Sequence, residues 1–129
     1  MKIKIQVVIE HEDEKLETIE EEINCLQRGR PSLETLGLTL AESKEILANF
    51  QEKIVKQQVA EHVQRFQLCE YCRQPRRRNG RQKMTYRTLF GNLRLSGQRF
   101  YHCLCRPQTT TSFSPIAGLI PERTAPEFC

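Results

Sequence analysis

CEYCRQPRRRNGRQKMTYRTLFGNLRLSGQRFYHCLC, residues 69–105, begins and ends with a pair of cysteines. The first pair is Cys69-x-x-Cys72 and the second is Cys103-x-Cys105. Four thiolates that converge from two loops bind Zn²⁺ tetrahedrally, and the ion replaces the core that so small a unit cannot build. The spacing therefore predicts a zinc-ribbon-like module, in which one structural zinc ion is held by Cys69, Cys72, Cys103 and Cys105.

Other interpretations of these cysteines stay open. The second pair is less regular than the first, because ribbons usually place two residues between the ligands. His102 together with Cys105 would restore that gap, so His102 is a reserve ligand. The cysteines could also be free buried thiols or a redox Cys-x-x-Cys, although the βαβ context of a redox motif is missing. A catalytic metal is disfavoured, since four cysteines leave no open coordination position.

Between the cysteine pairs, two strand-like runs flank Gly91-Asn92. Both residues tolerate a positive φ, so the pair suits a two-residue hairpin turn. That turn places Phe90 opposite Leu93 and Thr88 opposite Leu95. The predicted hairpin has an apolar face of Met84, Tyr86, Thr88, Phe90, Leu93 and Leu95, and a polar, cationic face of Lys83, Thr85, Arg87, Arg94, Ser96 and Gln98.

Positive charge is concentrated around this hairpin. From Arg65 to Arg106 there are 11 lysines and arginines, ten of them arginine, against the single acid Glu70. Guanidinium groups on one surface suit phosphate oxygens, which favours nucleic acid as the partner. A solvated basic face, or a surface for an acidic protein, is the alternative. The candidate DNA-binding residues are Arg73, Arg76, Arg77, Arg78, Arg81, Lys83, Arg87 and Arg94.

A long helix is predicted before the cysteine module. Thr39 and Glu42 form a capping box, and neither Gly nor Pro follows until about Arg65. A helix of about 26 residues is roughly 39 Å long. Its apolar line drifts around the axis through Leu40, Leu47, Phe50, Ile54, Val55, Val59, Val63 and Phe66. This length fits either pairing with a partner helix, as from a second copy, or a spacer between two small domains.

The N-terminal segment alternates apolar and polar residues, which predicts a strand over Lys2–Glu10. After the polar turn HEDEK, the chain fits either a helical stripe or a second strand. Because an isolated strand needs a partner, we expect a hairpin. The predicted class is α+β, organised as an N-terminal β-hairpin region (1–37), a long helix (38–67), a zinc-ribbon DNA-binding module (68–106) and a Pro-rich extended tail (107–129).

Composition excludes several classes of function. No stretch of about 18 apolar residues exists and the start lacks the features of a signal peptide, so we expect a cytoplasmic protein with no membrane partner. Asp13 is the single aspartate among 16 acidic residues in a chain of 129. A two-metal centre that needs paired aspartates therefore cannot be built, and we expect neither enzymatic activity nor a small-molecule substrate.

Four stretches of the chain, residues 35–63, 69–83, 86–105 and 113–128, resemble the N-terminal region of insertion-sequence transposases of the ISKra type. The most specific parts are YRTLFGNLRL, residues 86–95, and YHCLC, residues 101–105. The resemblance implies a DNA-binding region with a zinc-ribbon-like element on the four cysteines. In full-length members an RNase H-like domain with the catalytic aspartates and glutamate follows. No catalytic residue carries over to this chain.

The expected function is that of a non-catalytic DNA-binding fragment of a transposase, which binds transposon ends or DNA in general. One alternative is an interaction module or regulator that pairs through the long helix with itself or with a full-length transposase. Another is a relic of a decayed element.

Overall fold

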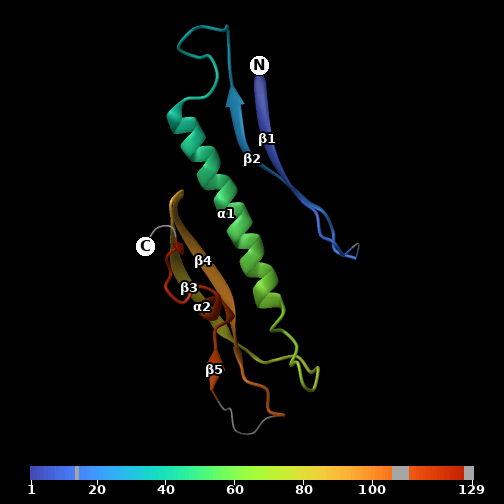
Figure 1. The fold of residues 1–129 in the computed structure, drawn as a ribbon. Coiled ribbons are helices and arrows are strands. Elements are labelled where there is room, and N and C mark those ends of the chain that lie inside the picture. The colour runs from blue at the N-terminus through green and yellow to red at the C-terminus, as the bar shows by residue number, and fades with distance from the viewer. Residues whose placement is uncertain (14, 106–110, 127–129) are drawn as a thin grey trace. The chain divides into compact units, whose positions relative to one another are not determined.

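The computed structural model describes residues 1–13, 15–105 and 111–126. The chain is α+β, with an N-terminal hairpin, a long helix and a C-terminal antiparallel sheet, as predicted (Figure 1). No helix in these three ranges combines the length and the apolar character needed to cross a membrane. The elements are β1 (Lys2–Ile9), β2 (Ile19–Gln27), α1 (Leu40–Gln64), β3 (Arg78–Thr88), β4 (Gly91–Tyr101), β5 (Ser112–Phe113) and α2 (Pro115–Leu119).

The chain divides into two compact units, Met1–Lys53 and Ile54–Cys129. The boundary lies inside α1, so each unit contains one part of the helix. This division differs from the four segments expected from the sequence, which treat the helix as an element of its own. We call the two parts unit 1 and unit 2 and describe each by itself.

In unit 1, β1 and β2 form an antiparallel hairpin that pairs Ile3 with Leu26 and Ile9 with Ile19. The hairpin interpretation is confirmed and the helical one is wrong. The register shifts at Ile5/Gln6, where Ile23 of β2 has no partner in β1. The side-chain amide of Asn49 donates to the Ile23 carbonyl at 3.3 Å and to Asn24 Oδ1 at 3.0 Å. The helix thus satisfies polar groups at the bulge.

The N-terminus of α1 is a capping box, as predicted. Glu42 Oε1 accepts from the Thr39 backbone N–H at 2.9 Å, and Thr39 Oγ1 accepts from the Glu42 N–H at 3.1 Å. Arg28 forms an ion pair with Glu42 and donates to the carbonyls of Thr35 and Gly37. The Arg28 guanidinium first, and the Thr39 N–H second, lower the pKa of Glu42 to about 2. One arginine therefore joins the hairpin, the connecting turn and the helix.

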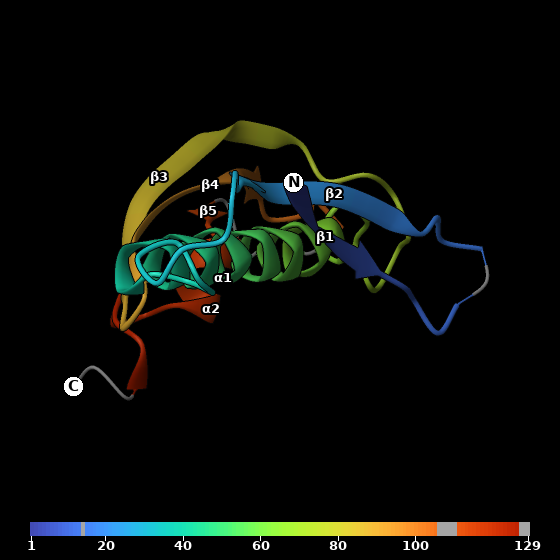
Figure 2. The same ribbon diagram turned by 90° about the horizontal axis from the view of Figure 1, so that it is seen from above.

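In unit 2, the sheet has the strand order β3-β4-β5 and is strongly curved (Figure 2). The predicted hairpin turn at Gly91-Asn92 is wrong, because Thr88 pairs with Gly91 and the turn is Leu89-Phe90. Thr88 Oγ1 donates to the Gly91 carbonyl at 2.8 Å and accepts from the Phe90 N–H at 3.2 Å. Gly91 directly follows this turn, and its φ of +125° is a conformation that favours glycine.

The register differs from the predicted one by four residues, which is an even number. Because side chains alternate with a period of two, an even shift leaves every strand residue on its predicted face. The face with Met84, Leu93 and Leu95 is buried, whereas Lys83, Arg87 and Arg94 are exposed. Phe90 alone leaves the predicted apolar face, because it lies in the turn and is 44% exposed.

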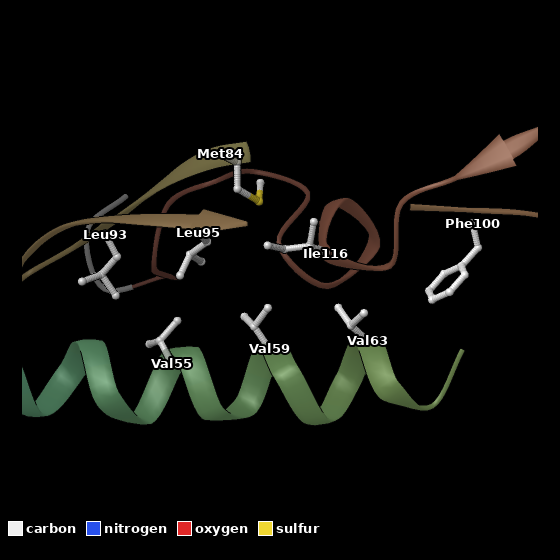
Figure 3. Packing of buried hydrophobic residues seen from close by; sticks show 8 residues of the cluster. All are labelled: Val55, Val59, Val63, Met84, Leu93, Leu95, Phe100 and Ile116. Carbon is white, nitrogen blue, oxygen red and sulfur yellow. The ribbon is translucent and has the colours of Figure 1, made fainter. Parts of the chain in front are cut away.

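The core of unit 2 is formed between the second part of α1 and the sheet. Val55, Val59 and Val63 recur every four residues along the helix and point at the sheet (Figure 3). The predicted apolar line is thus buried only here, since Leu40, Leu47 and Phe50 are exposed. The valines pack against Met84, Leu93, Leu95, Phe100 and Ile116.

The Pro-rich segment differs from the extended tail expected from the sequence. Phe113 of β5 pairs with Phe100 of β4, and Ile116 of α2 is fully buried. Ser114 caps α2, and Pro115 occupies its first turn, where a missing N–H costs nothing. Pro115 therefore marks the start of a helix. Residue 106 of the expected zinc-ribbon module, and residues 107–110 and 127–129 of the expected tail, lie outside the described residues.

Candidate metal centre

The first cysteine pair lies on a tight turn between α1 and β3. The backbone N–H of Cys69 donates to the Gln74 carbonyl and that of Arg73 donates to the Cys69 carbonyl, both at 2.9 Å. Arg73 has φ +62°, a left-handed conformation that closes the turn. These bonds hold both thiols on the same side of the loop.

The second cysteine pair follows the end of β4. The Tyr101 N–H donates to the Arg77 carbonyl at 2.9 Å, and the His102 N–H donates to the Thr111 carbonyl at 3.1 Å. The chain is therefore held on both sides just before Cys103 and Cys105. The sheet brings together two loops that are about 30 residues apart in sequence.

The four sulfur atoms form one cluster, as the spacing predicts. All four Sγ atoms lie within 4.8 Å of one another. Cys72 and Cys103 are 3.3 Å apart and Cys69 and Cys105 are 3.6 Å apart, measured between Sγ atoms. Tetrahedral coordination with metal–sulfur bonds of about 2.3 Å places the sulfurs about 3.8 Å apart. The cluster therefore has the dimensions that a four-thiolate metal ion needs.

The electrostatics of the cluster also favour a cation. Backbone N–H groups of Cys72 and Tyr71 lower the pKa of the Cys69 thiol to about 6. The neighbouring sulfur of Cys103, followed by desolvation and by Cys69, raises the pKa of the Cys105 thiol to about 12. The Cys69 thiol thus ionises readily, whereas neighbouring sulfur atoms and desolvation disfavour ionisation of the Cys105 thiol. A bound cation would allow all four to be thiolates at once.

His102 is not part of the sulfur cluster. Its ring lies against the Phe113 ring, with centroids 4.7 Å apart and an interplanar angle of 30°. Cys103 is therefore the fourth candidate metal ligand, and His102 does not replace it in this arrangement. The set of four cysteines has no open position, so it can stabilise a fold and it lacks the free site that metal catalysis requires.

Arg76 has a structural position beside the cluster. Its guanidinium lies 5.3 Å from the centre of the Phe113 ring and 5.9 Å from that of Phe66. Its Nη1 donates to the Phe66 carbonyl at 2.9 Å. Of the eight predicted DNA-binding residues, Arg76 is the one that packs inside the module, where a phosphate would have to compete with these contacts.

The other seven predicted cations are exposed on unit 2. The Arg77 guanidinium lies over the Tyr101 ring, 5.0 Å from its centre. Arg81 donates from Nε to Ser96 Oγ at 2.9 Å, across the hairpin. The seven residues, on the cysteine turn and on the β3–β4 hairpin, are Arg73, Arg77, Arg78, Arg81, Lys83, Arg87 and Arg94.

Sequence reasoning missed the part that Phe113 plays in this site. Its ring contacts the rings of Phe66 and His102, and the Arg76 guanidinium stacks on it. The Ser114-Pro115 helix start next to it was an available signal.

Comparisons of the chain with protein-family models, with curated proteins and with solved structures gave no match.

Proposed function

We propose that this chain is a non-catalytic DNA-binding module whose basic unit is held together by a structural zinc ion. The observation that carries the proposal is the position of the exposed arginines on the same unit as the four-cysteine cluster. Zinc suits four thiolates in a tetrahedron, and free thiols are kept reduced in the cytoplasm, where we place the protein. The resemblance to ISKra-type transposases makes transposon ends the expected target.

The charge distribution supports DNA as the partner. Unit 1 has 7 basic and 12 acidic residues, a net charge of −5, whereas unit 2 has 13 basic and 4 acidic residues, a net charge of +9. A polyanion is attracted to the second unit and repelled by the first. Most of these basic residues are arginines, whose planar guanidinium groups form bidentate hydrogen bonds with phosphate oxygens.

The test is binding of the zinc-loaded full chain to fluorescent duplex DNA between about 50 and 200 mM salt. We expect affinity to fall steeply with salt, because bound phosphates release counterions. The triple variant Arg77→Gln, Arg78→Gln, Arg87→Gln should weaken binding and flatten the slope by about 0.9 for each phosphate that the variant no longer neutralises. The matched control Lys2→Gln, Lys4→Gln, Lys44→Gln removes the same charge from unit 1. Equal effects of both triples would contradict the proposal.

A second candidate function is pairing of α1 with another helix, either of a second copy or of a full-length transposase. It is favoured by Leu40, Leu47 and Phe50, which lie along one side of the helix and are exposed. Self-pairing through these residues would be insensitive to salt, and sedimentation of the wild type against Leu47→Gln tests it. A monomer at all concentrations would exclude self-pairing.

A further inference from the structure

Unit 2 contains a cleft of about 580 Å³ between the second part of α1 and the β3–β4 hairpin. Val59, Val63 and Leu95 form apolar parts of its wall. Its cationic lining comes from three elements: Lys56 from α1, Arg78 and Arg81 from β3, and Arg94 from β4. The sequence pattern indicated DNA binding for the three arginines but gave Lys56 no function.

The charge of the cleft has one sign. Among the described residues that line it, four are cationic and none is a carboxylate, while Gln64, Gln67 and Gln98 add side-chain amides. Four cationic side chains and no carboxylate among the described lining residues give the cleft a positive potential. Such a lining is suited to a ligand with several negative charges.

The β-sheet side of the cleft is held in position before any ligand arrives. Arg81 donates from Nε to Ser96 Oγ at 2.9 Å and from Nη2 to the Ser96 carbonyl at 3.2 Å. Gln98 donates from Nε2 to the Gly80 carbonyl at 2.6 Å and to the Arg99 carbonyl at 2.9 Å. Arg81 has five N–H donors, so three remain for a ligand. A pre-positioned donor loses less conformational entropy on binding.

We propose that this cleft binds consecutive phosphate groups of one nucleic-acid strand, an inference that rests on the proposed DNA-binding function. The volume is in the range of small-molecule pockets, about 300–1,000 Å³, which suits the backbone of a single strand. Aromatic side chains that would stack on bases are missing from the described lining. Recognition is therefore through the backbone and is independent of base sequence.

The test compares binding of two fluorescent 12-mers to the zinc-loaded full chain. One is oligothymidylate and the other has the same backbone without bases. We expect equal affinities, because phosphates alone are contacted. The pair Lys56→Gln, Arg94→Gln should weaken both and lower the salt slope by about 1.4, or 0.7 for each contact. The control pair Arg65→Gln, Arg123→Gln removes the same charge from exposed positions of unit 2 outside the cleft. Zinc content and thermal unfolding show that each variant folds.

The outcomes separate the cleft from the proposed function. If the cleft pair and the control pair weaken strand binding equally while duplex binding stays steep in salt, the cleft inference fails and the proposed function stands. If the baseless 12-mer does not bind, base contacts replace phosphate contacts and the inference is overturned. Inorganic tripolyphosphate that binds more tightly than the 12-mers would assign the cleft to a small polyphosphate. If neither strand nor duplex binds, both proposals fail.

Discussion

At the scale of single residues, Cys72 gives the most direct test of the metal centre. Its Sγ lies 3.3 Å from that of Cys103, and a serine hydroxyl is a poor substitute for a thiolate ligand. Cys72→Ser should reduce the bound zinc from about one ion per chain to well under one, and loosen the end of the sheet.

Elemental analysis of reduced, purified protein measures this zinc content. Cys25→Ser is the matched control, because Cys25 lies in unit 1 outside the cluster. A Cys72→Ser protein that still binds one zinc ion per chain would show that the four cysteines do not bind the ion jointly.

Arg76 and Arg78 are two residues apart, but they should respond differently to substitution. Arg76 packs on two rings and donates to the Phe66 carbonyl, whereas Arg78 is exposed. Arg76→Gln should lower the free energy of unfolding by about 1–3 kcal/mol, since the carbonyl loses a charged donor. Arg78→Gln should change it by less than about 0.5 kcal/mol. Urea unfolding of the two variants makes the comparison, and equal stabilities would contradict the structural assignment of Arg76.

At the scale of elements, the N-terminus of α1 should depend on pH through Glu42. The Arg28 guanidinium lowers the pKa of Glu42 from 4.5 to about 2, so its contribution to stability is complete above about pH 4.5. The contribution is lost as the pH falls through about 2. Glu42→Gln should therefore lower the unfolding temperature at pH 7 and have little effect near pH 2.

Thermal unfolding followed by circular dichroism across this range is the measurement. Glu45→Gln, an exposed substitution one turn further along the same helix, is the control. A Glu42→Gln difference that is the same at pH 7 and at pH 2 would exclude the ion pair as its cause.

The C-terminal helix α2 should be essential to the core, although it is short. Ile116 is fully buried, and a Cβ added at Gly97 would lie 3.2 Å from the Ile116 Cβ, so the helix packs closely on β4. Ile116→Ala should cost about 2–5 kcal/mol through reduced burial and the cavity left behind. Leu119→Ala, in the same helix but 43% exposed, should cost much less. Equal decreases of the unfolding free energy in urea would contradict the packing described.

The elements that local signals specify were predictable from the sequence. Thr39 and Glu42 define the start of α1 because a capping box involves neighbouring residues. The hairpin register was not predictable, because Gly91-Asn92 suits a turn by itself and the four-residue shift leaves Leu93 and Leu95 on the buried face in both registers. The packing of Phe113 and Ile116 was missed since their partners are distant in sequence. Tertiary contacts therefore decide the packing of Phe113 and Ile116.

At the scale of the whole molecule, the separation of charge has a consequence for chemistry. Most carboxylates belong to unit 1, whose net charge repels phosphate, and Glu70 of unit 2 adjoins the four-cysteine cluster. Phosphodiester cleavage by two metal ions needs carboxylates that hold the ions about 4 Å apart. Purified protein incubated with labelled transposon-end DNA and Mg²⁺ or Mn²⁺ should leave the DNA intact. Cleavage that survives repurification and disappears when one of the chain's own glutamates is substituted would refute this.

The cleft shows which part of the candidate site could not be predicted. The four-cysteine cluster could be predicted from the sequence, since a Cys-x-x-Cys pair is a local pattern. Lys56 joins Arg78, Arg81 and Arg94 in the lining because Val55, Val59 and Val63 of the same helix pack against the sheet. The position of Lys56 beside the three arginines depends on packing and has no signature in the sequence.

The position of the four cysteines also has a kinetic consequence. Cys69 and Cys105 are 36 residues apart, and the chain between them is largely one hairpin with local contacts. Local contacts form early in folding, whereas closing a long loop is costly and comes late. An interaction made after the rate-limiting step changes the unfolding rate far more than the folding rate. We therefore expect a bound metal ion to leave the folding rate of the module nearly unchanged and to slow its unfolding.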